Sequence, residues 1–168
     1  MLRTRVSRTD DKRIFRMIRL YLLPFKRTFF PDASLSRREL ADRLRRGVTF
    51  VTAPGPGQPI DGFCHAVVVN KTLWIDLLAV DSRQRNRGRG SLLLKRAEQY
   101  GRRNGCRVSQ LYVDEHNFGA QAFYRKQGYE PKEYVPGLHC YLFDKELSAS
   151  RSRVYLTSWI IRAKGWRR

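Results

Sequence analysis

A segment rich in glycine and arginine is the strongest chemical signal in the sequence. It follows an apolar run that ends at Val80, and it consists of Arg85, Asn86, Arg87, Gly88, Arg89, Gly90 and Ser91. Two glycines one residue apart let the backbone turn tightly. The free N–H groups at the start of a following helix, together with the helix dipole, attract anions. The segment therefore predicts a loop that binds a phosphate or a pyrophosphate.

The spacing of this loop excludes two common phosphate-binding motifs. The sequence contains no G-x-x-x-x-G-K-[ST], which excludes a P-loop, and position 93 is leucine where the dinucleotide-binding fingerprint has its third glycine. Taken alone, the pattern also fits an ordinary glycine-rich turn at a helix start. The surrounding elements have to decide between these interpretations.

Periodicity and turn residues predict these elements along the chain. A helix begins near Thr9 and stops at Pro24, and a second begins at the capping box of Ser36 and Glu39. Two further helices are predicted over 88–104 and 117–127. Strands are predicted over 2–7, 48–52, 61–69, 73–80, 107–113, 129–135 and 138–144. This order indicates an α/β or α+β domain with a mixed sheet.

A second motif lies downstream of the glycine loop, with one predicted strand between them. It reads Asn117-x-x-Ala120-x-x-Phe123-Tyr124-x-x-x-Gly128-Tyr129. Together, the two motifs resemble the acetyl-CoA signatures of the GNAT superfamily of N-acetyltransferases. The resemblance implies a GNAT domain over 2–147, with a mixed sheet of about six or seven strands and about four helices. It also implies transfer of an acetyl group from acetyl-CoA to a primary amine, which belongs to a small molecule or is an amino group of a protein.

The resemblance assigns roles to individual residues. Leu78, Ala79 and Val80 would line the pantetheine arm, and the backbone amides from Arg85 to Ser91 would hold the pyrophosphate. Asn117 would contact the cofactor while it also caps its helix. Tyr124 would be the general acid for the leaving thiolate, because a phenol is protonated at neutral pH. The alternative for Tyr124 is a purely structural place in the core beside Phe123.

The general base is left open by the sequence. Some family members carry a glutamate on the strand where this sequence has Tyr112. Asp76 is the first alternative, because strand alternation would place it on the same face as Leu78 and Val80. A polar cluster at the end of the next strand, or a water chain, are further alternatives; the cluster consists of Asp114, Glu115 and His116.

The charge bears on the acceptor. Thirty-four Lys and Arg residues against fifteen Asp and Glu residues give a net charge of +19. Residues 148–168 are expected to form a basic, aromatic C-terminal extension with a possible role in homodimerisation. Because acids are scarce, an acceptor carried on RNA or the ribosome agrees better with this charge than a cationic small molecule. A non-catalytic module that binds acyl-CoA or nucleic acid is a third alternative.

Cysteine and histidine usage gives weaker expectations. Three dispersed cysteines indicate reduced thiols and a cytoplasmic protein, and the histidines lack the spacing of metal ligands. No metal is therefore expected. No apolar stretch approaches the length of a transmembrane helix, and the N-terminal region does not resemble a signal peptide.

Overall fold

The computed structural model describes residues 1–147, so the predicted extension over 148–168 lies outside the described residues. One mixed sheet of seven strands forms the centre of the fold, in the order β1-β2-β3-β4-β5-β7-β6. The strands are β1 (Leu2–Thr4), β2 (Val48–Thr52), β3 (Gly62–Val69), β4 (Thr72–Val80), β5 (Val108–Asp114), β6 (Glu130–Val135) and β7 (Cys140–Glu146). The strand predicted over 2–7 is shorter than expected, because α1 already begins at Ser7.

Five α-helices flank the sheet within residues 1–147, one more than the sequence predicts. They are α1 (Ser7–Tyr21), α2 (Leu23–Phe29), α3 (Arg37–Arg45), α4 (Arg89–Arg103) and α5 (Phe118–Lys126). The additional helix is α2. Pro24 interrupts the pattern of α1 but lies in the first turn of α2, where a helix does not need the missing N–H.

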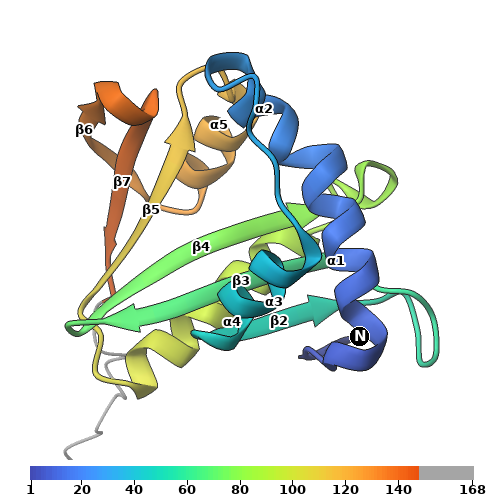
Figure 1. The fold of residues 1–168 in the computed structure, drawn as a ribbon. Coiled ribbons are helices and arrows are strands. Elements are labelled where there is room, and N and C mark those ends of the chain that lie inside the picture. Colours follow the sequence, from blue (N-terminus) through green and yellow to red (C-terminus); the bar gives the residue numbers. More distant parts are fainter. Residues whose placement is uncertain (148–168) are drawn as a thin grey trace, which may run out of the picture.

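The helices divide between the two faces of the sheet (Figure 1). On one face, α1 and α3 cover a core cluster that includes Ile14, Leu40 and Phe63. On the other face, α4 and α5 cover a larger cluster that includes Leu93 and Phe143. Each helix buries one apolar stripe against the strands, which is the usual way in which such layers become stable.

Strands β4 and β5 separate part-way along their length. They are parallel and pair only where Thr72–Trp74 lies beside Val108–Gln110. All other neighbouring strands of the sheet are antiparallel. Beyond Trp74 the facing edge of β4 has no strand partner in β5, so a gap opens in the middle of the sheet.

A β-bulge in β4 overturns one expectation from strand alternation. His65 of β3 pairs with Leu77 and Ala66 pairs with Ile75, which leaves Asp76 as the extra residue. Leu78 packs against the core cluster under α4, whereas the Asp76 carboxylate contacts Arg43 of α3 on the opposite face. The prediction that Asp76 shares a face with Leu78 and Val80 is therefore wrong, because one extra residue reverses the phase of the alternation.

Candidate functional site

A cavity of about 700 Å³ lies where β4 and the gap meet the starts of α4 and α5. Eleven of the cofactor-binding residues predicted from sequence line it: Leu78, Ala79, Val80, Arg85, Asn86, Gly88, Arg89, Gly90, Ser91, Asn117 and Tyr124. The exception is Arg87, whose guanidinium instead contacts Gln84 at 3.4 Å. Segments that are separate in the sequence thus form one site of the size expected for a small-molecule ligand.

The N-terminus of α4 supplies backbone donors to this cavity. Gly88 is the N-cap with a φ of 73°, a left-handed conformation that favours glycine. The first hydrogen bond of the helix runs from the N–H of Leu92 to the carbonyl of Gly88 at 2.9 Å. The backbone N–H groups of Arg89, Gly90 and Ser91 donate no hydrogen bond to any acceptor within residues 1–147. These unpaired donors and the helix dipole make an anion site.

The arginine side chains of the loop serve partly to hold the loop itself. The Nε of Arg85 donates to the carbonyl of Val80 at 3.3 Å, and its guanidinium lies 5.0 Å from the centre of the Tyr21 ring. The Nε of Arg89 lies 3.3 Å from a carboxylate oxygen of buried Asp61. Both cations therefore stay at the cavity wall, where they add positive charge to the backbone donors.

Helix α5 forms the wall that faces this loop. Asn117 caps it by accepting a hydrogen bond from the N–H of Ala120 at 3.1 Å, as the sequence predicts. Tyr124 lies on the same wall and is 8% exposed. Burial raises the pKa of the Tyr124 phenol, with a smaller contribution from Cys64. The two interpretations of Tyr124 are compatible, since it packs in the core cluster and also lines the cavity.

The candidates for the base lie outside the cavity lining. Both oxygens of Asp76 accept hydrogen bonds from Arg43, at 2.6 and 2.7 Å. The Nε2 of His65 lies 3.9 Å from the same carboxylate. Of the polar cluster at the end of β5, Glu115 accepts a hydrogen bond from Tyr134. Asp76 is therefore held by α3 on the face opposite the cavity.

Sequence reasoning missed one wall of the cavity. Tyr21 and Leu22 at the end of α1 and Phe25 of α2 line it. The available signal was that these residues lie within three positions of Pro24, where one helix stops and the chain turns. Phe123 was assigned to the core but also lines the cavity, beside Gly90.

A protein-family model for the GNAT family of acetyltransferases matches residues 14–129. The match spans both motifs and the strands that position them. The chain belongs to the GNAT family.

Two curated relatives share parts of this GNAT domain. An uncharacterized N-acetyltransferase of Methanocaldococcus jannaschii is 41% identical over 58 residues, which cover 34% of this chain and 26% of that protein. Blasticidin-S acetyltransferase of Streptomyces morookaense is 41% identical over 80 residues, which cover 45% of this chain and 57% of that protein. The matches thus span about a quarter and somewhat more than half of these relatives.

A solved structure with this fold contains coenzyme A. The PaiA N-acetyltransferase of Thermoplasma acidophilum in complex with coenzyme A superposes with a TM-score of 0.69 at 19% identity, and the match covers 87% of this chain and 99% of that chain. The GNAT fold predicted from sequence is therefore confirmed.

Three further observations concern the described part of the GNAT chain. No helix in residues 1–147 is long and apolar enough to cross a membrane. In the same range, no group of three or more His, Cys, Asp or Glu residues could hold a metal ion. Cys64, Cys106 and Cys140 are all buried and free.

Proposed function

We propose that this GNAT protein transfers the acetyl group of acetyl-CoA to a primary amine. The observation that carries the proposal is the shared cavity, in which the donors of α4, the unpaired end of β4 and Tyr124 of α5 meet. The residues present fit the substrate. A pyrophosphate matches the three unpaired N–H groups, and a pantetheine arm has the open edge of β4 beside it. One curated relative is named an N-acetyltransferase and the other an acetyltransferase, and these names support the same reaction.

The reaction replaces the C–S bond of the thioester with a C–N bond. The amine nitrogen attacks the thioester carbonyl, a C–N bond forms, the C–S bond breaks, and coenzyme A leaves as a thiolate. Tyr124 donates its phenolic proton to that sulfur, and its raised pKa means that the phenol carries this proton at neutral pH. A backbone N–H on the open edge of β4 would stabilise the negative charge on the carbonyl oxygen. The phenolate then recovers a proton from solvent.

The attacking amine must also lose a proton, and we keep Asp76 as the proposed base. It lies on the face of the sheet opposite the cavity, so an amine that enters from that face meets it before the thioester. Because both of its oxygens are bound by Arg43, proton uptake competes with a charge-assisted ion pair. A chain of water molecules is the alternative route.

The test is release of free thiol from acetyl-CoA in the presence of primary amines. Tyr124→Phe should lower kcat by about 10²-fold or more, since general acids contribute about 10²–10⁴-fold, while the Kd for coenzyme A stays unchanged. Tyr100→Phe is the matched control, because Tyr100 is a half-buried tyrosine of α4 that packs on Phe50 and does not line the cavity. Coenzyme A binding without any transfer by the unmodified protein would contradict catalysis and favour a non-catalytic acyl-CoA-binding module.

An acceptor carried on RNA or the ribosome is the second candidate. The exposed side of α1 supports it, because it presents four cations without an ion-pair partner in residues 1–147: Arg8, Lys12, Arg16 and Arg19. Labelled acetyl-CoA incubated with a fractionated cell extract distinguishes the candidates. Label in the RNA or ribosomal fraction, with RNA affinity that falls steeply with salt, favours the second one.

A further inference from the structure

The gap between β4 and β5 connects the cavity to the opposite face of the sheet. Beyond Trp74 and Gln110, no residue of β4 pairs with a residue of β5. Leu78 and Val80 line the cavity on the side of α4 and α5. An acetyl group held there is therefore reachable, through the gap, by an amine that lies on the other face.

Two aromatic side chains lie on that other face at the point where the strands separate. Trp74 pairs with Gln110, and Tyr112 follows two residues later on β5, so all three side chains share a face. The Trp74 and Tyr112 rings stack with centroids 5.5 Å apart and an interplanar angle of 30°. Tyr112 is nevertheless 49% exposed. Aromatic faces attract ammonium groups, most strongly the face of tryptophan.

One ring nitrogen of a buried histidine at the same place lacks a hydrogen-bond partner within the described residues. His65 is fully buried, and its Nδ1 is 2.9 Å from the hydroxyl of Thr49. Its Nε2 has no hydrogen-bond partner among residues 1–147 and points at the Asp76 carboxylate, 3.9 Å away. Asp76, the bulge residue of β4, lies two positions after Trp74, so this polar pair borders the aromatic pair. Such unsatisfied groups suit a place where a ligand donates hydrogen bonds.

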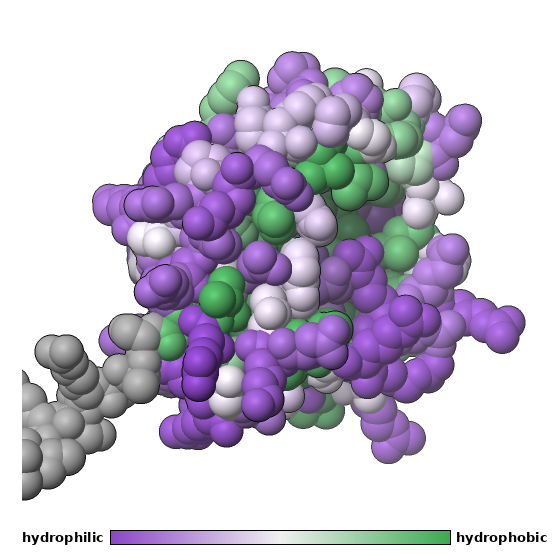
Figure 2. Space-filling model, turned by 90° about the vertical axis from the view of Figure 1, so that its left-hand side faces the viewer, coloured by the Kyte–Doolittle hydropathy of each residue, from purple (hydrophilic) through white to green (hydrophobic). Residues whose placement is uncertain are grey.

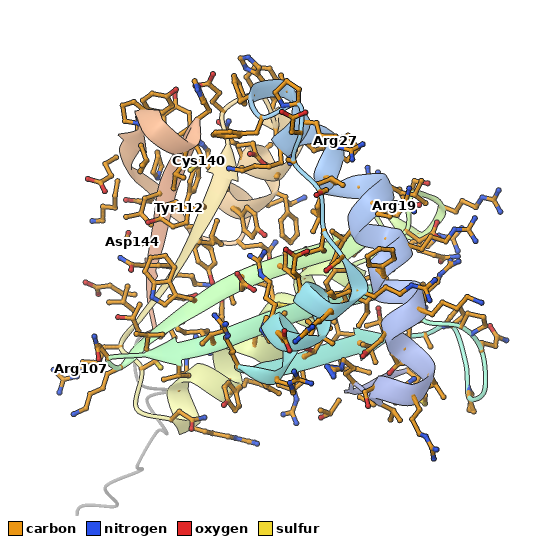
Figure 3. All side chains as sticks on the ribbon, in the orientation of Figure 1. Arg19, Arg27, Arg107, Tyr112, Cys140 and Asp144 are labelled. Carbon is orange, nitrogen blue, oxygen red and sulfur yellow. The ribbon has the colours of Figure 1, made fainter. Side chains whose placement is uncertain are left out.

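The same face carries carboxylates toward β6. The register places Leu142 beside Tyr112, and Glu133 beside Leu142. By the same register, Asp144 of β7 lies next to Glu130. Within the described chain, no ion pair involves Glu130 or Glu133, whereas Asp144 pairs with Lys132 at 3.5 Å. Figure 3 shows Tyr112 and Asp144 on the neighbouring strands.

Strands β5 to β7 and the segments between them carry a net negative charge, whereas the whole chain is strongly positive. Residues 108–147 contain six acids and four Lys or Arg residues, in a chain whose net charge is +19. Seen from the edge that carries β6 and β7, pale and green surface is set back among purple, hydrophilic surface (Figure 2). The expectation that acids are too scarce for a cationic acceptor therefore does not describe this face.

We infer that this face binds an aliphatic amine with a second positive charge, with the reacting nitrogen at Trp74 and Tyr112 and the second cation near Glu133. This inference rests on the proposed acetyl transfer. Tyr112 and Glu133 are two strand spacings apart, which is about 10 Å. Trp74, Tyr112 and Glu133 are thus specificity-determining residues, and the acceptor class is a linear diamine or polyamine.

The experiment compares α,ω-diamines of four to ten carbons with monoamines of the same length, as kcat/KM for acetylation. We expect diamines of intermediate length to be preferred by about tenfold or more, which corresponds to about 1.4 kcal/mol. Glu133→Gln should remove most of this preference by lowering kcat/KM for the diamines towards the value for the monoamines. Lys132→Gln, which removes the neighbouring cation, should increase it. Trp74→Ala should raise KM for both series.

Two results would overturn the inference while the proposed function stands. One is equal kcat/KM for diamines and monoamines, or a preference that Glu133→Gln leaves unchanged. The other is labelled acetyl that enters only RNA or ribosomal material. If coenzyme A binds but no acceptor of any kind is acetylated, the proposed function itself fails and the inference fails with it. Because Glu133 is an exposed residue of edge strand β6, its variant should keep the thermal stability of the parent, which a melting curve verifies.

Discussion

The Cβ that Gly90 lacks would lie 3.2 Å from the ring of Phe123. This close approach joins the two halves of the candidate site, since Gly90 belongs to the first turn of α4 and Phe123 to α5. Both residues line the cavity. The two sequence motifs are therefore in contact, and the width of the cavity between them depends on the absence of a side chain at position 90.

Gly90→Ala should narrow the cavity. The added methyl group displaces the Phe123 ring, and overpacking of this kind costs about 1–3 kcal/mol of unfolding free energy. Titration with coenzyme A should show weaker binding by about tenfold, or about 1.4 kcal/mol. The double variant with Phe123→Leu should recover part of both losses. Gly88→Ala is the control for backbone strain alone, because its Cβ would meet nothing within 4 Å at a φ of 73°. No recovery in the double variant would contradict the steric explanation.

The pH profile tests the state of Tyr124. Burial is the main cause that raises the pKa of its phenol, so the folded protein holds the proton to higher pH than a free tyrosine does. An acid of this kind is active below its pKa, and kcat should therefore show no loss from phenol ionisation up to about pH 10. Measurement of kcat from pH 7 to 10 provides the test. A descending limb near pH 9 that disappears in Tyr124→Phe would contradict it.

The local parts of the site could be predicted from sequence, and the long-range parts could not. Gly88 and Asn117 act through their own turn and cap, so their types and spacing were sufficient. The bulge at Asp76 arises from the pairing of β4 with β3, and no local pattern signals it. Pro24 fits both the end of one helix and the start of the next, which is why α2 was missed.

The paired variants Asp76→Asn and Arg43→Gln distinguish a base from a structural ion pair. If Asp76 accepts the amine proton, Asp76→Asn should lower kcat by about 10²-fold, while Arg43→Gln leaves the carboxylate in place and keeps kcat within about tenfold. Because Arg43 is exposed, loss of the pair should cost no more than about 1 kcal/mol of stability. Equal and small effects of both variants on kcat would assign the proton to water instead.

His65 should make stability depend on pH. Burial lowers the pKa of this imidazole, against the opposing charge of Asp76, and Arg43 and Arg5 lower it further. The folded state therefore favours the neutral ring. The resulting stabilisation is complete above the pKa of the unfolded chain, about 6.5, and is lost as the pH falls through the lower pKa of the folded state. Urea denaturation at pH 7.5 and 5.5 should show a decrease that is smaller in His65→Gln. An equal decrease in both proteins would assign the effect to carboxylates.

Arg89 should contribute to stability as well as to anion binding. Its partner Asp61 is 4% exposed, and no hydrogen bond within residues 1–147 reaches either carboxylate oxygen. Arg89→Ala would leave that buried charge without its counter-ion, at a cost of about 3 kcal/mol. The double variant with Asp61→Asn should recover most of the lost unfolding free energy, since an amide carries no charge to neutralise.

Urea denaturation of the two single variants and the double variant measures this coupling without any ligand. Arg87→Ala is the matched control, because within residues 1–147 its guanidinium hydrogen-bonds only to Gln84, and its loss should change stability by no more than about 0.5 kcal/mol. Additive effects of Arg89→Ala and Asp61→Asn would show that the two side chains do not stabilise each other. Strong coupling would mean that Asp61, 28 positions earlier in the sequence, fixes the first turn of α4 in the orientation that an anion requires.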